Sequence, residues 1–204
     1  MKRTRSKHIN IEDNPQYIEN PLTDISTLNW KTLNDVSIIN LKETLINDIQ
    51  KYINNGLDKS TFKFIVASDS QRHDAKITYV TSIIFLRLGH GGNAYCLKEH
   101  YLSEDLTIKN LTRSERLSKV KNAARERLWT ECLKSIACAK WVDNILFDFG
   151  LKVSEIHSDV NFSKKYLSNE LLNAITGFIT SQEYKSVIKP ESWGASKIAD
   201  RKTK

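Results

Sequence analysis

A continuous apolar run in the first half of the chain ends abruptly at an acidic residue. The run is Phe62–Gln71 (FKFIVASDSQ), in which Asp69 stands between two serines. A strand that is apolar at consecutive positions is buried on both faces, as at the centre of a sheet covered by helices. The pattern therefore places Asp69 at the C-terminal end of a central strand, where α/β sheets carry binding and catalytic groups.

Two further strands are predicted directly after this one. The segments Ile77–Leu88 and Ala94–Leu102 are rich in β-branched and aromatic residues, and only short polar segments separate the three strands. Short connections favour an antiparallel meander. Residues 89–92 (GHGG) lie between two strands and precede no helix, so they favour a tight turn over a phosphate-binding loop.

The segment before the central strand predicts a helix over about residues 40–55. Its apolar residues recur every three or four positions, which is helical spacing. Asn40 is a candidate N-cap, and Gly56 is a candidate C-terminal stop. We expect this helix to cover one face of the sheet.

A much longer helix is predicted over residues 112–147, opened by a capping box of Thr112 and Glu115. At about 100° per residue, one narrow stripe holds Leu117, Val120, Ala124, Leu128, Ser135, Cys138 and Val142. Glu131 falls inside this stripe, whereas Glu126 falls roughly opposite to it. Because a buried carboxylate is costly, Glu131 either pairs with a buried Arg or Lys or belongs to a functional site. The other sides of the helix carry Arg113, Arg116, Lys119, Arg125 and Arg127.

The last third of the chain predicts two more strands, each followed by a helix. The strand at residues 152–159 ends in Asp159, a helix covers residues 163–181, and a fifth strand covers residues 184–188. A final short helix at residues 192–201 carries Asp200. The order βββαβαβα predicts an α/β fold with a five-stranded mixed sheet flanked by helices. The fourth strand should run parallel to the first through a right-handed crossover.

Composition adds a domain division and a class of partner. We expect residues 1–27 to form a flexible, basic and polar N-terminal arm and residues 28–204 to form one domain. Lys and Arg exceed Asp and Glu by 31 to 24, a net charge of +7. This surplus favours a polyanion partner such as nucleic acid, although a basic protein without such a partner fits the charge equally well.

The cysteines and the apolar runs bear on the compartment. Cys96, Cys132 and Cys138 show neither a paired nor a metal-binding spacing, which is typical of reduced thiols in a cytoplasmic protein. The basic N-terminus has no apolar segment after it, and no run approaches the roughly 18 apolar residues that cross a membrane. We therefore expect a cytoplasmic protein with no membrane partner. The sequence leaves the oligomeric state open.

Four acidic residues are predicted to converge on one end of the sheet. If the first and fourth strands are neighbours, about 4.8 Å apart, Asp69 and Asp159 lie close together at the same sheet edge. Glu131 and Asp200 lie on helices that can pack beside them. Carboxylates at close range require a proton or a cation between them, and Mg²⁺ or Mn²⁺ suit such oxygen ligands.

The segments ASDSQ (Ala67–Gln71), EIHSD (Glu155–Asp159), and IKPESWGAS with IADRKTK (Ile188–Lys204) together resemble the ribonuclease H-like YkuK family. The resemblance covers roughly residues 28–204. It implies the ribonuclease H-like fold and phosphodiester hydrolysis with two Mg²⁺ or Mn²⁺ ions. By this resemblance Asp69 would bridge both ions, and Glu131 would hold one beside the scissile phosphate. Asp159 would complete the other, and Asp200 would be the most mobile ligand.

Residues near the four acids are further candidates for substrate contact: Ser68, Ser70, Gln71, His73, His157 and Lys189. The two serines and the glutamine would bind phosphate or orient Asp69, and Lys189 would contact phosphate. His157 would assist proton transfer or product release. The alternative for His157 is a packed, hydrogen-bonded residue of its strand.

Together these features predict a metal-dependent nuclease acting on RNA, RNA–DNA hybrid or structured DNA. Its catalytic residues would be Asp69, Glu131, Asp159 and Asp200. One alternative is a protein of the same fold that binds nucleic acid without cutting it. A second alternative is a structural adaptor that uses the N-terminal arm as a tether. The sequence does not choose between endonuclease and exonuclease action.

Overall fold

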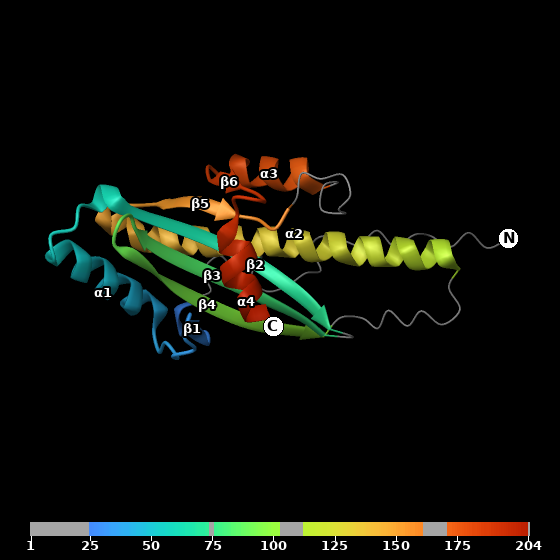
Figure 1. The fold of residues 1–204 in the computed structure, drawn as a ribbon, viewed down its shortest axis with the longest axis horizontal. Helices are drawn as coiled ribbons and strands as arrows, with labels where there is room; N and C mark the ends of the chain where they lie inside the picture. Colours follow the sequence, from blue (N-terminus) through green and yellow to red (C-terminus); the bar gives the residue numbers. More distant parts are fainter. Residues whose placement is uncertain (1–24, 74–75, 103–111, 161–170, 204) are drawn as a thin grey trace.

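The computed structural model describes residues 25–73, 76–102, 112–160 and 171–203 (Figure 1). The strands are β1 (Trp30–Thr32), β2 (Phe62–His73), β3 (Lys76–Arg87), β4 (Gly91–Leu102), β5 (Val153–His157) and β6 (Lys185–Val187). The α-helices are α1 (Leu41–Asn54), α2 (Arg113–Leu146), α3 (Leu172–Ser181) and α4 (Asp200–Thr203). Short helical segments are η2 (Ile25–Thr27), η3 (Lys59–Thr61), η4 (Phe147–Phe149) and the π-helical η6 (Gly194–Ala199).

The strands form one mixed sheet in the order β1-β4-β3-β2-β5-β6. Strands β2, β3 and β4 make the predicted antiparallel meander, and β5 pairs in parallel with β2. β6 continues the sheet in parallel with β5. The α/β class and the mixed sheet are therefore confirmed, and β2 lies inside the sheet with a neighbour on each side.

The number of strands differs from the prediction, because the sheet has six strands and not five. The extra strand is β1, which pairs antiparallel with β4 at the edge of the sheet. β1 is only three residues long, so it shows no alternating pattern in the sequence. Its Trp30 is fully buried and donates from Nε1 to the carbonyl oxygen of Ile25 at 2.8 Å. Pairing with β4 and burial of this one side chain define the strand.

The two faces of the sheet are covered by different helices. Helices α1, α2 and α3 share one large apolar cluster with Phe64 and Val66 of β2 and with Phe85 of β3. The C-terminal segments η6 and α4 pack on the opposite face, where Ala199 forms a small apolar cluster with Val80 and Cys96. Figure 1 shows α2 behind the strands and the C-terminal helical segment across their front. Each face of β2 thus meets a different helix.

The local start and stop signals behave as predicted. The Asn40 side chain accepts from the backbone N–H of Glu43, and α1 is followed by Gly56 with φ of 78°. The capping box of Thr112 and Glu115 is present at the start of α2. Gly89 and His90 lie in the tight turn between β3 and β4, and Gly89 and Gly91 both adopt positive φ. The first part of the predicted helix at 163–181 lies outside the described residues.

One expectation for α2 was wrong in its first half. The predicted apolar stripe is buried from Glu131 onward, but Leu117 and Val120 are 58% and 48% exposed. The reason is length: the first turns of α2 run past the strands and have no sheet to pack against (Figure 1). In the described part of the chain, none of the helices combines the length and the apolar character that crossing a bilayer requires.

The aromatic cluster between α1 and the sheet should carry a large share of the stability. Phe85 is fully buried, stacks on Phe64 at 4.5 Å between ring centroids, and meets the edge of Phe62 at 5.1 Å. We expect Phe85→Ala to lower the free energy of unfolding by about 3–5 kcal/mol in urea denaturation. The matched control is Phe147→Ala, at a position that is 81% exposed, which should change it by less than about 1 kcal/mol. Equal effects of the two variants would contradict this view of the core.

Candidate active site

The parallel pairing of β2 and β5 brings two aspartates to the same end of the sheet. The last paired positions are Ala67 in β2 and His157 in β5. Two residues further along each segment stand Asp69 and Asp159. Asp69 is still inside β2 and shares a face with Ala67, whereas Asp159 lies just past the end of β5. Asp69 is buried, at 8% exposure, and the side chain of Asp159 is 26% exposed. The two aspartates predicted to be neighbours are therefore placed at matching positions.

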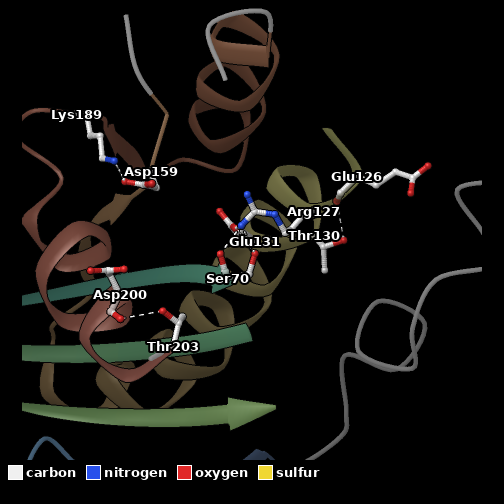
Figure 2. A network of polar contacts seen from close by, with 9 residues as sticks. All are labelled: Ser70, Glu126, Arg127, Thr130, Glu131, Asp159, Lys189, Asp200 and Thr203. Atoms are coloured by element: carbon white, nitrogen blue, oxygen red, sulfur yellow. Dashed lines mark hydrogen bonds and ion pairs between the residues drawn. The ribbon is translucent and has the colours of Figure 1, made fainter. Parts of the chain in front are cut away.

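Helix α2 supplies the third acid from the face on which it packs. Glu131 is buried and accepts a short hydrogen bond from the Ser70 hydroxyl, next to Asp69 in the chain. Arg127, one turn earlier, donates to the Ser70 carbonyl oxygen, to Ser70 Oγ at 2.9 Å and to Glu131 Oε1 at 3.5 Å. In contrast, Glu126 is exposed and points away from this group (Figure 2). Glu131 thus has the arginine partner that the first suggestion required, and its place in a functional site stays a prediction.

The fourth acid comes from the C-terminal helical segment. Asp200 begins α4 directly after η6, and its carbonyl oxygen accepts from Thr203 Oγ1 at 2.8 Å. Figure 2 shows Glu131 beside Ser70, Asp159 beside Lys189, and Asp200 on the C-terminal helical segment. The four acids thus come from β2, α2, α4 and the segment after β5, and their convergence on one point stays a prediction.

Two of the four acids, Asp69 and Glu131, have raised pKa values. Burial raises the pKa of Asp69 to about 7, and the negative charges of Asp159 and Asp200 add to this rise. Burial likewise raises the pKa of Glu131 to about 8, with Asp69 contributing further. The Arg127 guanidinium opposes both shifts without cancelling them. The basic side chains of the site therefore do not fully compensate its carboxyl groups. This condition favours a bound cation.

The donors suit a hard divalent cation in kind, but they are not gathered around one point. Within the described residues, no group of three His, Cys, Asp or Glu side chains is placed to hold a metal ion. Instead, Lys189 Nζ lies 2.6 Å from Asp159 Oδ1, and Arg127 lies against Glu131. Carboxylate oxygens are the ligands that Mg²⁺ and Mn²⁺ prefer. Two of the four candidate ligands are thus paired with basic side chains in this structure.

The candidates for substrate contact fall into different environments. Ser68 is buried inside the sheet, where its hydroxyl lies 3.0 Å from Thr81 Oγ1. Ser70 is engaged with Arg127 and Glu131, and Gln71 is half-buried beside them. His73 is exposed at the end of β2, about 13 Å beyond Asp69 along the strand. Of the candidates for substrate contact, Ser70, Gln71 and Lys189 lie next to the acids.

His157 lies in a buried hydrogen-bond chain behind the acids. Its Nδ1 accepts from the backbone N–H of Gly194 at 3.1 Å, so the ring proton lies on Nε2 and is donated to Glu155 Oε2 at 3.1 Å. Burial lowers the pKa of His157, which is consistent with a neutral ring. Gly194 begins η6, so this chain ties the segment that leads to Asp200 to strand β5. The geometry matches the packed, hydrogen-bonded alternative for this histidine.

Glu155 anchors the same chain across three strands. It receives Lys63 Nζ of β2 at 2.9 Å and Lys185 Nζ of β6 at 2.8 Å, in addition to His157. Burial favours a higher pKa, but these three hydrogen bonds outweigh it and lower the pKa of Glu155 to about 2. The carboxylate is therefore ionised at neutral pH and fixes the position of the His157 ring.

Arg127 is the site residue that sequence reasoning missed, since it was read only as part of a basic helix surface. A signal was available, because Arg127 and Glu131 are four residues apart and share one side of a helix. The pairing of Lys189 with Asp159 had no such signal. It joins two residues that lie 30 positions apart in the chain.

Comparison with known proteins supports this fold. Residues 44–204 match the family described as Ribonuclease H-like, and the chain belongs to that family. A relative from Bacillus subtilis (strain 168), named "Uncharacterized protein YkuK", is 27% identical over 158 residues, which are 72% of this chain and 81% of the relative. No solved structure matches the chain significantly. The resemblance inferred from the sequence is confirmed at the level of family and fold.

The raised pKa values predict how stability depends on pH when no divalent cation is bound. Asp69 and Glu131 stabilise the fold fully only below their usual pKa values of 3.8 and 4.5, and this contribution is lost as the pH rises through about 7 and 8. In EDTA, the free energy of unfolding should therefore fall between about pH 5 and pH 8. An asparagine at position 69 cannot ionise. In the Asp69→Asn variant the decrease of the free energy of unfolding over this pH range should therefore be smaller by on the order of 2 kcal/mol.

Urea denaturation at several pH values measures this difference. The control is Asp148→Asn, at an exposed position on η4, whose profile should run parallel to that of the natural sequence. If Asp69→Asn also runs parallel to it, Asp69 does not carry a raised pKa.

Proposed function

We propose that this chain is a nuclease that depends on Mg²⁺ or Mn²⁺ and hydrolyses phosphodiester bonds in RNA, RNA–DNA hybrid or structured DNA. The observation that carries the proposal is the pairing of Ala67 in β2 with His157 in β5, each of which stands two residues before an aspartate. Membership of the ribonuclease H-like family supports the same class of chemistry.

In this proposal Asp69, Glu131, Asp159 and Asp200 are the residues that would hold two ions. When bound, such a pair of ions stabilises the attacking and leaving oxygens of an in-line displacement at phosphorus. The acids suit that task because burial and mutual repulsion raise the pKa values of Asp69 and Glu131, and a cation relieves both costs. Asp200, on a short C-terminal helix, would be the ligand that adjusts most easily.

The basic residues of the site would act on the substrate. Lys189 pairs with Asp159 in this structure, and in the loaded site its ammonium group would turn from the carboxylate to a phosphate oxygen. Arg127 holds Ser70 and Glu131 together from the side of α2, which keeps Glu131 beside Asp69. Glu155 and His157 would keep the C-terminal segment in place without touching the substrate.

Cation binding can be tested without any substrate. Mg²⁺ or Mn²⁺ at millimolar concentration should raise the Tm of the natural sequence, because an ion that binds the folded state stabilises it by mass action. The increase should be a few degrees and should be lost in Asp69→Asn but kept in Asp148→Asn. Equal increases in all three proteins would show that the ions bind elsewhere.

Cleavage is tested on a labelled panel of single-stranded RNA, RNA–DNA hybrid, single-stranded DNA, duplex DNA and a four-way junction. We expect cutting of at least one substrate in Mn²⁺ or Mg²⁺, none in EDTA, and a loss of about 100-fold or more in Asp69→Asn. Asp148→Asn should cut normally. Binding without cutting under every condition would instead favour a nucleic-acid-binding protein on the same fold, with Arg127 and Lys189 in the places of the cations.

A further inference from the structure

The first half of α2 stands in solvent next to the candidate active site. Every residue from 113 to 120 is exposed, which amounts to more than two helical turns. In Figure 1 this half of α2 projects beyond the ends of the strands. A short helix without tertiary packing is only marginally stable in water. We call residues 113–127 the α2 extension.

The α2 extension is strongly basic. Its fifteen residues include six Lys or Arg and two Glu. Arg113, Arg116 and Lys119 are exposed, and Arg127, at the C-terminal end of the extension, is half-buried. The exposed apolar residues Leu117 and Val120 run along the same segment. Such a mixture of positive charge with apolar contact area suits a nucleic acid strand better than an acidic or purely apolar protein surface.

A hollow of about 380 Å³ joins the α2 extension to the candidate active site. On the strand side it is lined by Gln71, Arg72 and Ile77, and on the helix side by Val120, Ala124 and Arg127. Gln71 Oε1 is buried there and has no hydrogen-bond partner among the described residues. Arg127 lines the hollow and also contacts Ser70, next to Asp69. The hollow has apolar residues that can contact a base, an acceptor that can receive a hydrogen bond, and arginines that can contact phosphate.

We infer that the α2 extension and this hollow form a binding track for one nucleic acid strand, which leads from the solvent to the four acids. This inference rests on the proposed function and gives it a substrate requirement. From Arg113 to Arg127 the helix rises about 21 Å. At 3.4 Å per phosphate along one strand of a duplex, the track spans about six nucleotides on one side of the scissile bond.

The test compares two variants of equal charge in EDTA, so that no cleavage is needed. The first carries Arg113→Gln, Arg116→Gln and Lys119→Gln, since glutamine keeps helix propensity. The control carries Lys42→Gln, Lys51→Gln and Lys152→Gln, three exposed lysines away from the α2 extension. Fluorescence anisotropy with a labelled 20-nucleotide RNA or DNA measures the affinity at several salt concentrations.

The α2 variant should bind at least about 10-fold more weakly than the control variant, and its slope of log affinity against log salt should be shallower by about 2 to 3. Equal affinities and equal slopes of the two variants would overturn the inference. A changed sedimentation coefficient with unchanged affinity would also overturn it, and would make the α2 extension a contact with a second copy of the chain.

A second measurement does not depend on removing charge. A photo-cross-linker attached at Ser118→Cys on the α2 extension should capture the oligonucleotide, while the same reagent at Asn47→Cys on α1 should not. The three native cysteines are buried. Cross-linking at both positions, or at neither, would contradict the track.

Failure of this inference and failure of the nuclease proposal remain distinguishable. Cleavage with no dependence on the α2 extension would leave the nuclease and reject the track. Binding through the α2 extension without cleavage would keep the track and reject the nuclease.

Discussion

The parallel pairing of β2 with β5 is the constraint on which the rest of this structure depends. It fixes the register at Ala67 and His157 and so carries Asp69 and Asp159 to the same end of the sheet. Because the side-chain period of a strand is two, a slip by one residue would turn one aspartate to the opposite face. The crossover through α2 is what permits parallel pairing, and it also delivers Glu131. Fold and candidate site are therefore consequences of the same connection.

Placing several acids together has an energetic cost, and the surrounding structure holds them in place. The Glu155 carboxylate ties β2, β5 and β6 together through two lysines, and through His157 it reaches the start of η6. The space around Gly194 is tight: a Cβ atom there would lie 3.0 Å from His157 Nδ1 and from Ile84. The hydrogen bond from the Gly194 backbone N–H to His157 thus holds the C-terminal segment that carries Asp200, at a position where a larger residue would require its neighbours to shift.

Most of the fold follows from local patterns in the sequence. The apolar run at β2, the capping box at Thr112 and the glycine turn before β4 each have a cause within a few residues, so they could be predicted. The strand β1 could not, because three residues gain their conformation only from pairing with β4. The exposed stripe at Leu117 also escaped prediction, since periodicity identifies the face of a helix but not where the sheet ends.

The candidate site divides along the same line. The four acids were identifiable from their order and their positions at the ends of elements, whereas their partners were not. Lys189 meets Asp159 only because of how the chain bends after β6, and Arg127 turns towards Ser70 because α2 crosses β2 there. These contacts join residues that are far apart in the sequence, so no local sequence pattern predicts them.

The central claim is that the four acids form one site for divalent cations. The most direct measurement is X-ray diffraction from crystals grown with Mn²⁺, collected where Mn²⁺ scatters anomalously. The account predicts anomalous peaks between Asp69 and Asp159, with Glu131 or Asp200 beside them and with Lys189 turned away from Asp159. Peaks elsewhere, or none at this place while the Lys189–Asp159 ion pair stays intact, would contradict it.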